Sequence, residues 1–138
     1  MTLNASRKIL VVEDSEFVRQ IYRVAFRKIG SYEVIHANDG AEGLTALGIH
    51  ERFDLAIVDI NMPVMNGLTF IDRLRGVAKH RATPVLVATT ESADGKIRDL
   101  VARAGITHLR KPFTLERLLE VLKALLPPVP KSSPPGTP

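Results

Sequence analysis

Short runs of apolar, mostly branched residues alternate with longer segments in which apolar residues recur at helical spacing, and the alternation occurs five times along the chain. A run of four or five apolar residues is typical of a strand that is buried on both faces, whereas longer amphipathic segments are typical of helices. Strands that are separated by helices pair in parallel, with the helices covering the sheet. The sequence therefore predicts an α/β fold with a doubly wound, five-stranded parallel sheet.

The predicted strands cover residues 8–12, 33–37, 55–58, 84–88 and 107–110, and the predicted helices cover residues 15–29, 41–50, 66–74, 93–104 and 114–126. Ser15 and Thr114 are expected to cap the helices that they begin, because a hydroxyl can accept a hydrogen bond from a free backbone N–H of the first turn. Gly30 and Gly105 are expected to end helices. Pro84 is expected at the first position of its strand, where a missing N–H is tolerated.

The 138 residues suit one domain, and 45% of them are hydrophobic, which is enough for a single core. From Pro127 the sequence becomes rich in proline and serine and cannot pack a core. We expect one folded domain over residues 1–126 and a disordered tail or linker over residues 127–138.

Composition excludes several classes of function. The chain has no cysteine, which excludes disulfides and thiolate metal sites and suits the reducing cytoplasm. No apolar run is long enough to span a membrane. The net charge of +4 would suit an acidic partner such as nucleic acid, but aromatic residues are few, and Arg19, Arg23 and Arg27 recur at a spacing that predicts one solvated helix face. Nucleic acid is therefore not the expected partner.

Polar residues with reactive side chains follow four of the five predicted strands. In open parallel sheets, sites form beyond the carboxyl ends of the strands. The residues at these ends are Glu13 and Asp14 after the first strand, Asp59 after the third, Thr89, Thr90 and Glu91 after the fourth, and Lys111 after the fifth. We expect them to meet at one edge of the sheet.

These residues suit phosphoryl transfer. Neighbouring carboxylates repel one another unless a proton or a cation neutralises them, and an oxygen-only ligand set favours Mg²⁺. A carboxylate such as Asp59 can then act as a nucleophile towards a phosphoryl group. Lys111 would supply positive charge to the phosphoryl oxygens, and Thr89 would donate a hydrogen bond to one of them.

Five motifs, taken together, resemble the response-regulator receiver domain, and most closely the single-domain, CheY-like chemotaxis type. The motifs are Val11–Ser15, Ile57–Pro63, Met65–Gly67, Val87–Glu91 and Lys111–Phe113. The resemblance covers about residues 7–126 and implies a flavodoxin-like sheet with strand order 2-1-3-4-5.

The resemblance also implies roles for particular residues. Asp59 would be the phosphoacceptor, and Mg²⁺ would be held by Glu13, Asp14, Asp59 and the backbone carbonyl of Asn61. Lys111, followed by a cis peptide before Pro112, would contact the phosphoryl group. Thr89 would move inward with it, together with the residue at position 108. The side chains that would flank the site and set the lifetime of the phosphoryl group are Asn61, Thr90 and Glu91.

The implied partners are a histidine kinase or phosphotransfer protein as donor and a downstream protein. The downstream protein would bind the face formed by helix 93–104, strand 107–110 and helix 114–126. The chain would be a monomer or a phosphorylation-dependent dimer, and it would catalyse only its own phosphorylation and dephosphorylation.

Two positions depart from the family pattern. His108 stands where the family has a tyrosine or phenylalanine, and its imidazole titrates near neutral pH. This substitution suggests a switch that is weaker or sensitive to pH. Thr90 is larger than the residue that the family prefers there, and its bulk could slow the entry of a phosphoryl group.

Three alternatives stay open. An aspartyl phosphohydrolase needs a second aspartate two residues after the nucleophile, where this chain has Asn61. A pseudo-receiver would keep the fold as a binding module without phosphorylation, and only His108 favours it. Finally, the tail after Pro127 could be a linker to an output domain.

Overall fold

Five parallel strands form the centre of the computed structural model, which describes residues 7–60, 65–90, 99–100, 102–103 and 105–126. The strands are β1 (Arg7–Val12), β2 (Tyr32–Ala37), β3 (Leu55–Asp59), β4 (Val85–Thr89) and β5 (Ile106–Arg110). Their order is β2-β1-β3-β4-β5, and every pair of neighbours is parallel. The structure confirms the predicted α/β fold and the strand order that the resemblance implied.

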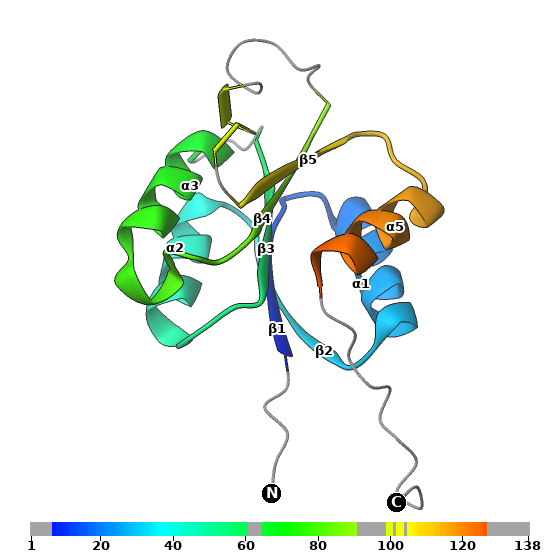
Figure 1. Ribbon diagram of the computed structural model, residues 1–138, viewed down its shortest axis with the longest axis horizontal. Coiled ribbons are helices and arrows are strands. Elements are labelled where there is room, and N and C mark those ends of the chain that lie inside the picture. The colour runs from blue at the N-terminus through cyan, green and yellow to red at the C-terminus, as the bar shows by residue number, and fades with distance from the viewer. Residues whose placement is uncertain (1–6, 61–64, 91–98, 101, 104, 127–138) are drawn as a thin grey trace, which may run out of the picture.

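Helices cover both faces of the sheet (Figure 1). α1 (Glu16–Ile29) and α5 (Leu115–Leu125) lie on one face, and α2 (Gly40–Ile49) and α3 (Gly67–Gly76) lie on the other. A short 3-10 helix, η1 (Ala78–His80), follows α3 and was not predicted. Most of the predicted helix 93–104 lies outside the described residues, although Asp99 and Leu100 are helical. No helix in the described part of the chain is long and apolar enough to cross a membrane.

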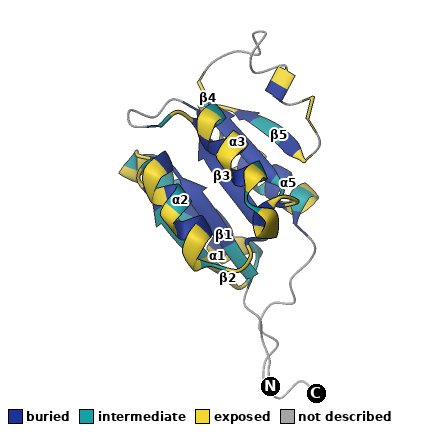
Figure 2. Cartoon of the chain, turned by 90° about the vertical axis from the view of Figure 1, so that its left-hand side faces the viewer, coloured by how far each residue is buried: buried dark blue, intermediate teal, exposed yellow. Residues whose placement is uncertain are grey.

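The sheet separates two hydrophobic cores, and successive residues of β1 point to opposite sides. Leu10 and Val12 pack with residues of α2 and α3, whereas Ile9 and Val11 pack with residues of α1 and α5. β3 and β4 are buried along their whole length, as their continuous apolar runs predicted (Figure 2). These central strands form a rigid base for the residues at their carboxyl ends.

Side-chain caps fix the points at which the helices begin after the strand-end loops. Ser15 Oγ accepts a hydrogen bond from Val18 N at 3.3 Å, and Thr114 Oγ1 accepts one from Arg117 N at 3.0 Å, so both predicted caps are confirmed. Asp39 and Asn66 cap α2 and α3 in the same way. Gly30 and Gly105 have positive φ angles of 151° and 79°.

Two local expectations were wrong. Pro84 precedes β4 rather than beginning it, and its carbonyl accepts a hydrogen bond from Ala56 N at 2.9 Å. The arginines of α1 do not form one solvated face, because only 14% of the Arg19 side chain is exposed. Their spacing places them on one side of the helix, but the Arg19 guanidinium donates hydrogen bonds to Glu13 O and Asn38 Oδ1, which lie outside α1.

Candidate functional site

Glu13, Asp14 and Asp59 converge at the carboxyl edge of the sheet. Each offers a carboxylate oxygen, and these oxygens all lie within 4.8 Å of one another. The sheet topology explains the convergence, because β1 and β3 are neighbours and Val12 pairs with Val58, so the residues that follow these strands emerge side by side. The predicted cluster of three carboxylates is present.

The three carboxylates differ in their contact with solvent. Glu13 is 1% exposed and Asp59 is 6% exposed, whereas Asp14 is open to solvent. Buried carboxylates that lie this close together repel one another, so a divalent cation would relieve both the repulsion and the cost of desolvation. The donor set contains only oxygen atoms and is open on one side, which fits Mg²⁺ with retained water ligands.

Lys111 brings a positive charge into the cluster from the far edge of the sheet. Its Nζ lies 2.8 Å from Glu13 Oε1 and 3.6 Å from Asp59 Oδ2, and only 13% of its side chain is exposed. Its backbone N–H donates to Thr89 O at 2.8 Å, which ties the segment after β5 to the end of β4. The peptide bond between Lys111 and Pro112 is cis, as the resemblance implied.

The Glu13 carboxyl group carries the clearest electrostatic perturbation at the site. Burial raises its pKa above the ordinary value, and the Asp59 charge acts in the same direction. The hydrogen bond and charge of Lys111 oppose the rise, as does a hydrogen bond that Ser15 N donates to Glu13 Oε2 at 3.2 Å. The contact with Lys111 therefore favours the ionised form of Glu13, whereas burial and Asp59 favour the protonated form.

The predicted switch residues lie on neighbouring strands. Thr89 is fully buried at the end of β4, directly after Ala88, which pairs with Asp59. His108 on β5 pairs with Val87 of β4 and is half-buried, and its Nε2 is buried without a hydrogen-bond partner among the described residues. Burial and the nearby Arg110 charge lower the His108 pKa, which favours the neutral imidazole.

The remaining predicted residues divide into two groups. Thr90 is exposed and directly follows Thr89, the last residue of β4. Asn61 and Glu91 lie outside the described residues. Their predicted roles, as metal ligand and flanking side chains, stay predictions.

Two residues that shape the site were missed in the sequence. Arg19 Nη1 donates to Glu13 O at 2.7 Å and to Asn38 Oδ1 at 2.6 Å, and so it joins the loop after β1 to the loop after β2. A Cβ atom on Gly67 would lie 2.5 Å from Asp59 O, so only glycine lets α3 begin this close to the backbone of Asp59. The Asn66-Gly67 pair signalled a helix start but not this contact.

The fold and the site together define a class of protein: a doubly wound α/β domain with an acidic cluster and a lysine at the carboxyl edge of its sheet. The response regulator receiver domain family matches residues 9–123 of the sequence. The chain therefore belongs to this family, as a CheY-like receiver domain of two-component signalling.

Individual relatives support the assignment. The chain is 36% identical to a chemotaxis protein CheY homolog of Campylobacter jejuni over 121 residues, which cover 86% of this chain and 92% of the homolog. It is 34% identical to chemotaxis protein CheY1 of Helicobacter pylori over 121 residues, which cover 86% of this chain and 96% of CheY1. The structure of Vibrio cholerae CheY4 matches with a TM-score of 0.78 and 38% identity, covering 88% of this chain and all of that one (100%).

Proposed function

We propose that this receiver domain accepts a phosphoryl group on Asp59 from a phosphohistidine of a histidine kinase or phosphotransfer protein. The observation that carries the proposal is the convergence of Asp59 with two further carboxylates and the Lys111 ammonium in one largely buried site. Asp59 alone would suit a simple helix cap, but a cap has no need of a buried lysine from the opposite edge of the sheet. Phosphoryl transfer, in contrast, needs a metal-binding pair of carboxylates such as Glu13 and Asp14 and a positive charge such as that of Lys111.

In the proposed reaction an Asp59 carboxylate oxygen attacks phosphorus, the bond from phosphorus to the histidine nitrogen breaks, and an aspartyl phosphate forms. The Lys111 ammonium lies 3.6 Å from Asp59 Oδ2, near enough to contact a phosphoryl group on Asp59. The Thr89 hydroxyl would donate a hydrogen bond to a phosphoryl oxygen. The carboxylates of Glu13, Asp14 and Asp59, with the carbonyl of Asn61, would hold Mg²⁺, which supplies positive charge to the phosphoryl oxygens when it is bound. The protein would catalyse only its own phosphorylation and dephosphorylation.

The proposed output is a change in the face formed by β5, α5 and the predicted helix 93–104. Thr89 and His108 lie on adjacent, paired strands. A shift of Thr89 towards the phosphoryl group would therefore change the packing of β5. A downstream protein that binds one arrangement of this face more tightly would shift the population towards that arrangement. His108 is smaller than the aromatic residue of the family and holds a buried nitrogen, which favours a weaker switch.

The presence of His108 in place of the aromatic residue of the family also favours a second candidate, a pseudo-receiver that binds partners without phosphorylation. If the His108 switch does not respond, the domain would act only as an interaction module. The two candidates differ in whether Asp59 is ever modified.

A small phosphodonor separates the two functions. We would incubate the protein with acetyl phosphate and Mg²⁺ and measure the intact mass, expecting a gain of about 80 Da for one phosphoryl group. Asp59→Asn should remove the gain, whereas Asp72→Asn, at an exposed position on α3, should keep it. A folded, metal-binding protein that gains no mass from the phosphodonor or from kinases would support the pseudo-receiver.

A further inference from the structure

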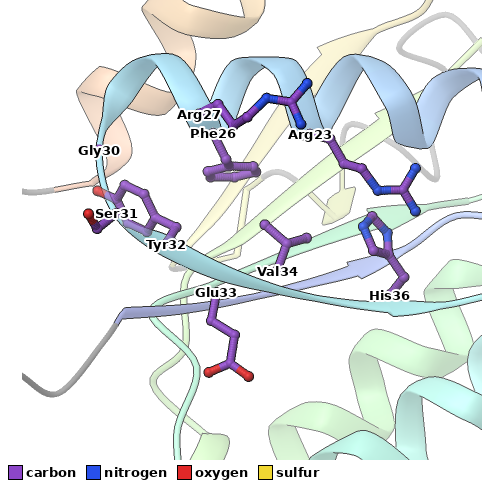
Figure 3. A pocket seen from close by; sticks show the side chains of 9 residues that line it. All are labelled: Arg23, Phe26, Arg27, Gly30, Ser31, Tyr32, Glu33, Val34 and His36. Carbon is purple, nitrogen blue, oxygen red and sulfur yellow. The ribbon is translucent and has the colours of Figure 1, made fainter.

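A groove between α1 and β2 lies apart from the phosphoryl site and has no role in the function proposed above. It has a volume of about 580 Å³ and is lined by the C-terminal half of α1 and by the length of β2 (Figure 3). The rings of Phe26 and Tyr32 meet edge to face within it, with centroids 5.5 Å apart. It is an open surface groove, with the Phe26–Tyr32 pair at its base.

The groove is positively charged. Arg23 and Arg27 line it from α1. His36 lines it from β2 but does not add to this charge, because burial and the charges of Arg23 and Arg19 lower its pKa and favour the neutral ring. The one acidic residue of its lining, Glu33, points away from α1 in Figure 3. Arg23 also bonds Glu16 at 3.0 Å, but Arg27 is exposed and has no ion-pair partner in the described part of the chain. An acidic ligand would meet Arg27 without breaking an existing contact.

The groove also borders an open edge of the sheet. β2 is the last strand on its side, and among the described residues it pairs only with β1. The outer backbone N–H and C=O groups of an edge strand can pair with an added strand. Edge pairing supplies affinity through the main chain, and the side chains on alternate positions supply specificity.

The pattern of residues along β2 indicates what an added strand would carry. Tyr32, Val34 and His36 face α1 (Figure 3), whereas Ile35 packs on the side of α2 and α3. In an added strand, alternate side chains would therefore meet the arginines of the groove or the apolar flank at Ile35. Acidic residues suit the first set of positions, and branched apolar residues suit the second.

We propose that the α1–β2 groove is a docking site for an extended segment of a partner protein, in which acidic and branched apolar residues alternate and which adds to β2 as a further strand. The two arginines select the acidic side chains, and the β2 backbone supplies the pairing. This surface is separate from the face proposed for the downstream target, so the two partners could bind together.

The test uses the unphosphorylated protein and a short capped peptide in which valine alternates with glutamate. We expect the peptide to shift the backbone amide resonances of Tyr32–Ala37 and to slow hydrogen exchange along β2. A peptide of the same sequence with methylated backbone nitrogens keeps the charge but cannot pair, and it should not bind. Equal binding of both peptides, or shifts that map to another surface, would overturn the proposal.

Charge reversal supplies the matched control. Arg27→Glu should weaken peptide binding by roughly fivefold, the order expected when an exposed ion pair becomes a repulsive one. Arg73→Glu reverses an exposed arginine that also lies in the last turn of its helix, on α3, and should leave binding unchanged. Equal effects of the two variants would overturn the proposal. So would a single-stranded oligonucleotide that shifts the β2 resonances when the peptide does not.

Discussion

The Lys111 ammonium nitrogen lies 2.8 Å from Glu13 Oε1, and the two side chains are only 13% and 2% exposed. The same nitrogen is farther from Asp59, at 3.6 Å. In the absence of a phosphoryl group, the lysine therefore neutralises the acidic neighbour more closely than the proposed acceptor. A small shift from Glu13 towards Asp59 would be enough for Lys111 to contact a new phosphoryl oxygen.

Breaking the Lys111–Glu13 pair should destabilise the metal-free protein. Lys111→Met leaves two buried carboxylates without their cation, and we expect a loss of about 2–4 kcal/mol in the free energy of unfolding, near the range for a broken buried ion pair. Urea denaturation in a chelating buffer measures it. Adding Glu13→Gln to the variant should recover most of the loss, because the desolvated charge is then gone. Effects of the two substitutions that simply add would contradict the pairing.

Removing a carboxylate should stabilise the metal-free protein and abolish its response to magnesium. Asp14→Asn relieves repulsion within the cluster, so its melting temperature in a chelating buffer should exceed that of the parent. Magnesium at about ten times its dissociation constant should stabilise the parent by about 1.4 kcal/mol and should leave the variant unchanged. Asp72→Asn, at an exposed ion pair with Arg103, serves as the control and should respond to magnesium as the parent does.

The contact between Gly67 and Asp59 should make Gly67 intolerant of any side chain. Gly67→Ala places a Cβ atom 2.5 Å from Asp59 O and 2.8 Å from Ile60 Cα, so the backbone must shift, at a cost of about 1–3 kcal/mol. Gly76→Ala in the same helix meets nothing within 4 Å and should be neutral or slightly stabilising. Chemical denaturation of both variants compares them. If both lose the same stability, the close approach is not what excludes alanine at position 67.

Stability should fall in mild acid, partly because of His108. Its pKa is lowered in the folded protein by burial and by Arg110, so the unfolded chain takes up a proton first as the pH falls through the ordinary histidine range. The stabilisation from neutral His108 is thus present above the unfolded pKa and is lost as the pH falls towards the folded pKa. His108→Phe should lose less stability than the parent between about pH 7.5 and about pH 5.5. Chemical denaturation at several pH values measures the stability of both proteins. If the two stabilities fall by the same amount over this pH range, His108 does not have this role.

Much of the fold could be predicted because it depends on local patterns. The apolar run at β3 shows a buried strand, and Ser15 and Thr114 are helix caps whose geometry needs only a few neighbouring residues. The acidic cluster could be predicted from the rule that sites form at the carboxyl ends of parallel strands. The strand order of the sheet could be predicted only from the family resemblance, since no local pattern determines which strands are neighbours.

Other features depend on contacts between distant segments and left no clear signal. Arg19 has the spacing of a solvated arginine, yet it bonds the Glu13 carbonyl because the loops after β1 and β2 meet beside it. The fully buried His80 lies within 2.8 Å of Leu47 O, and this contact joins η1 to the end of α2. The roles of these two residues could not be predicted from the sequence, because their partners Asn38 and Leu47 lie far from them along the chain.

The central claim is that Asp59 itself carries the phosphoryl group, and chemical trapping tests it most directly. Borohydride reduces an aspartyl phosphate to homoserine, which lowers the mass of that residue by about 14 Da relative to unmodified aspartate. After phosphorylation and trapping, peptide mass spectrometry should locate homoserine at Asp59 and at neither Glu13 nor Asp14. A phosphorylated protein in which the trapped residue lies elsewhere, or in which no carboxylate is reduced, would contradict the claim.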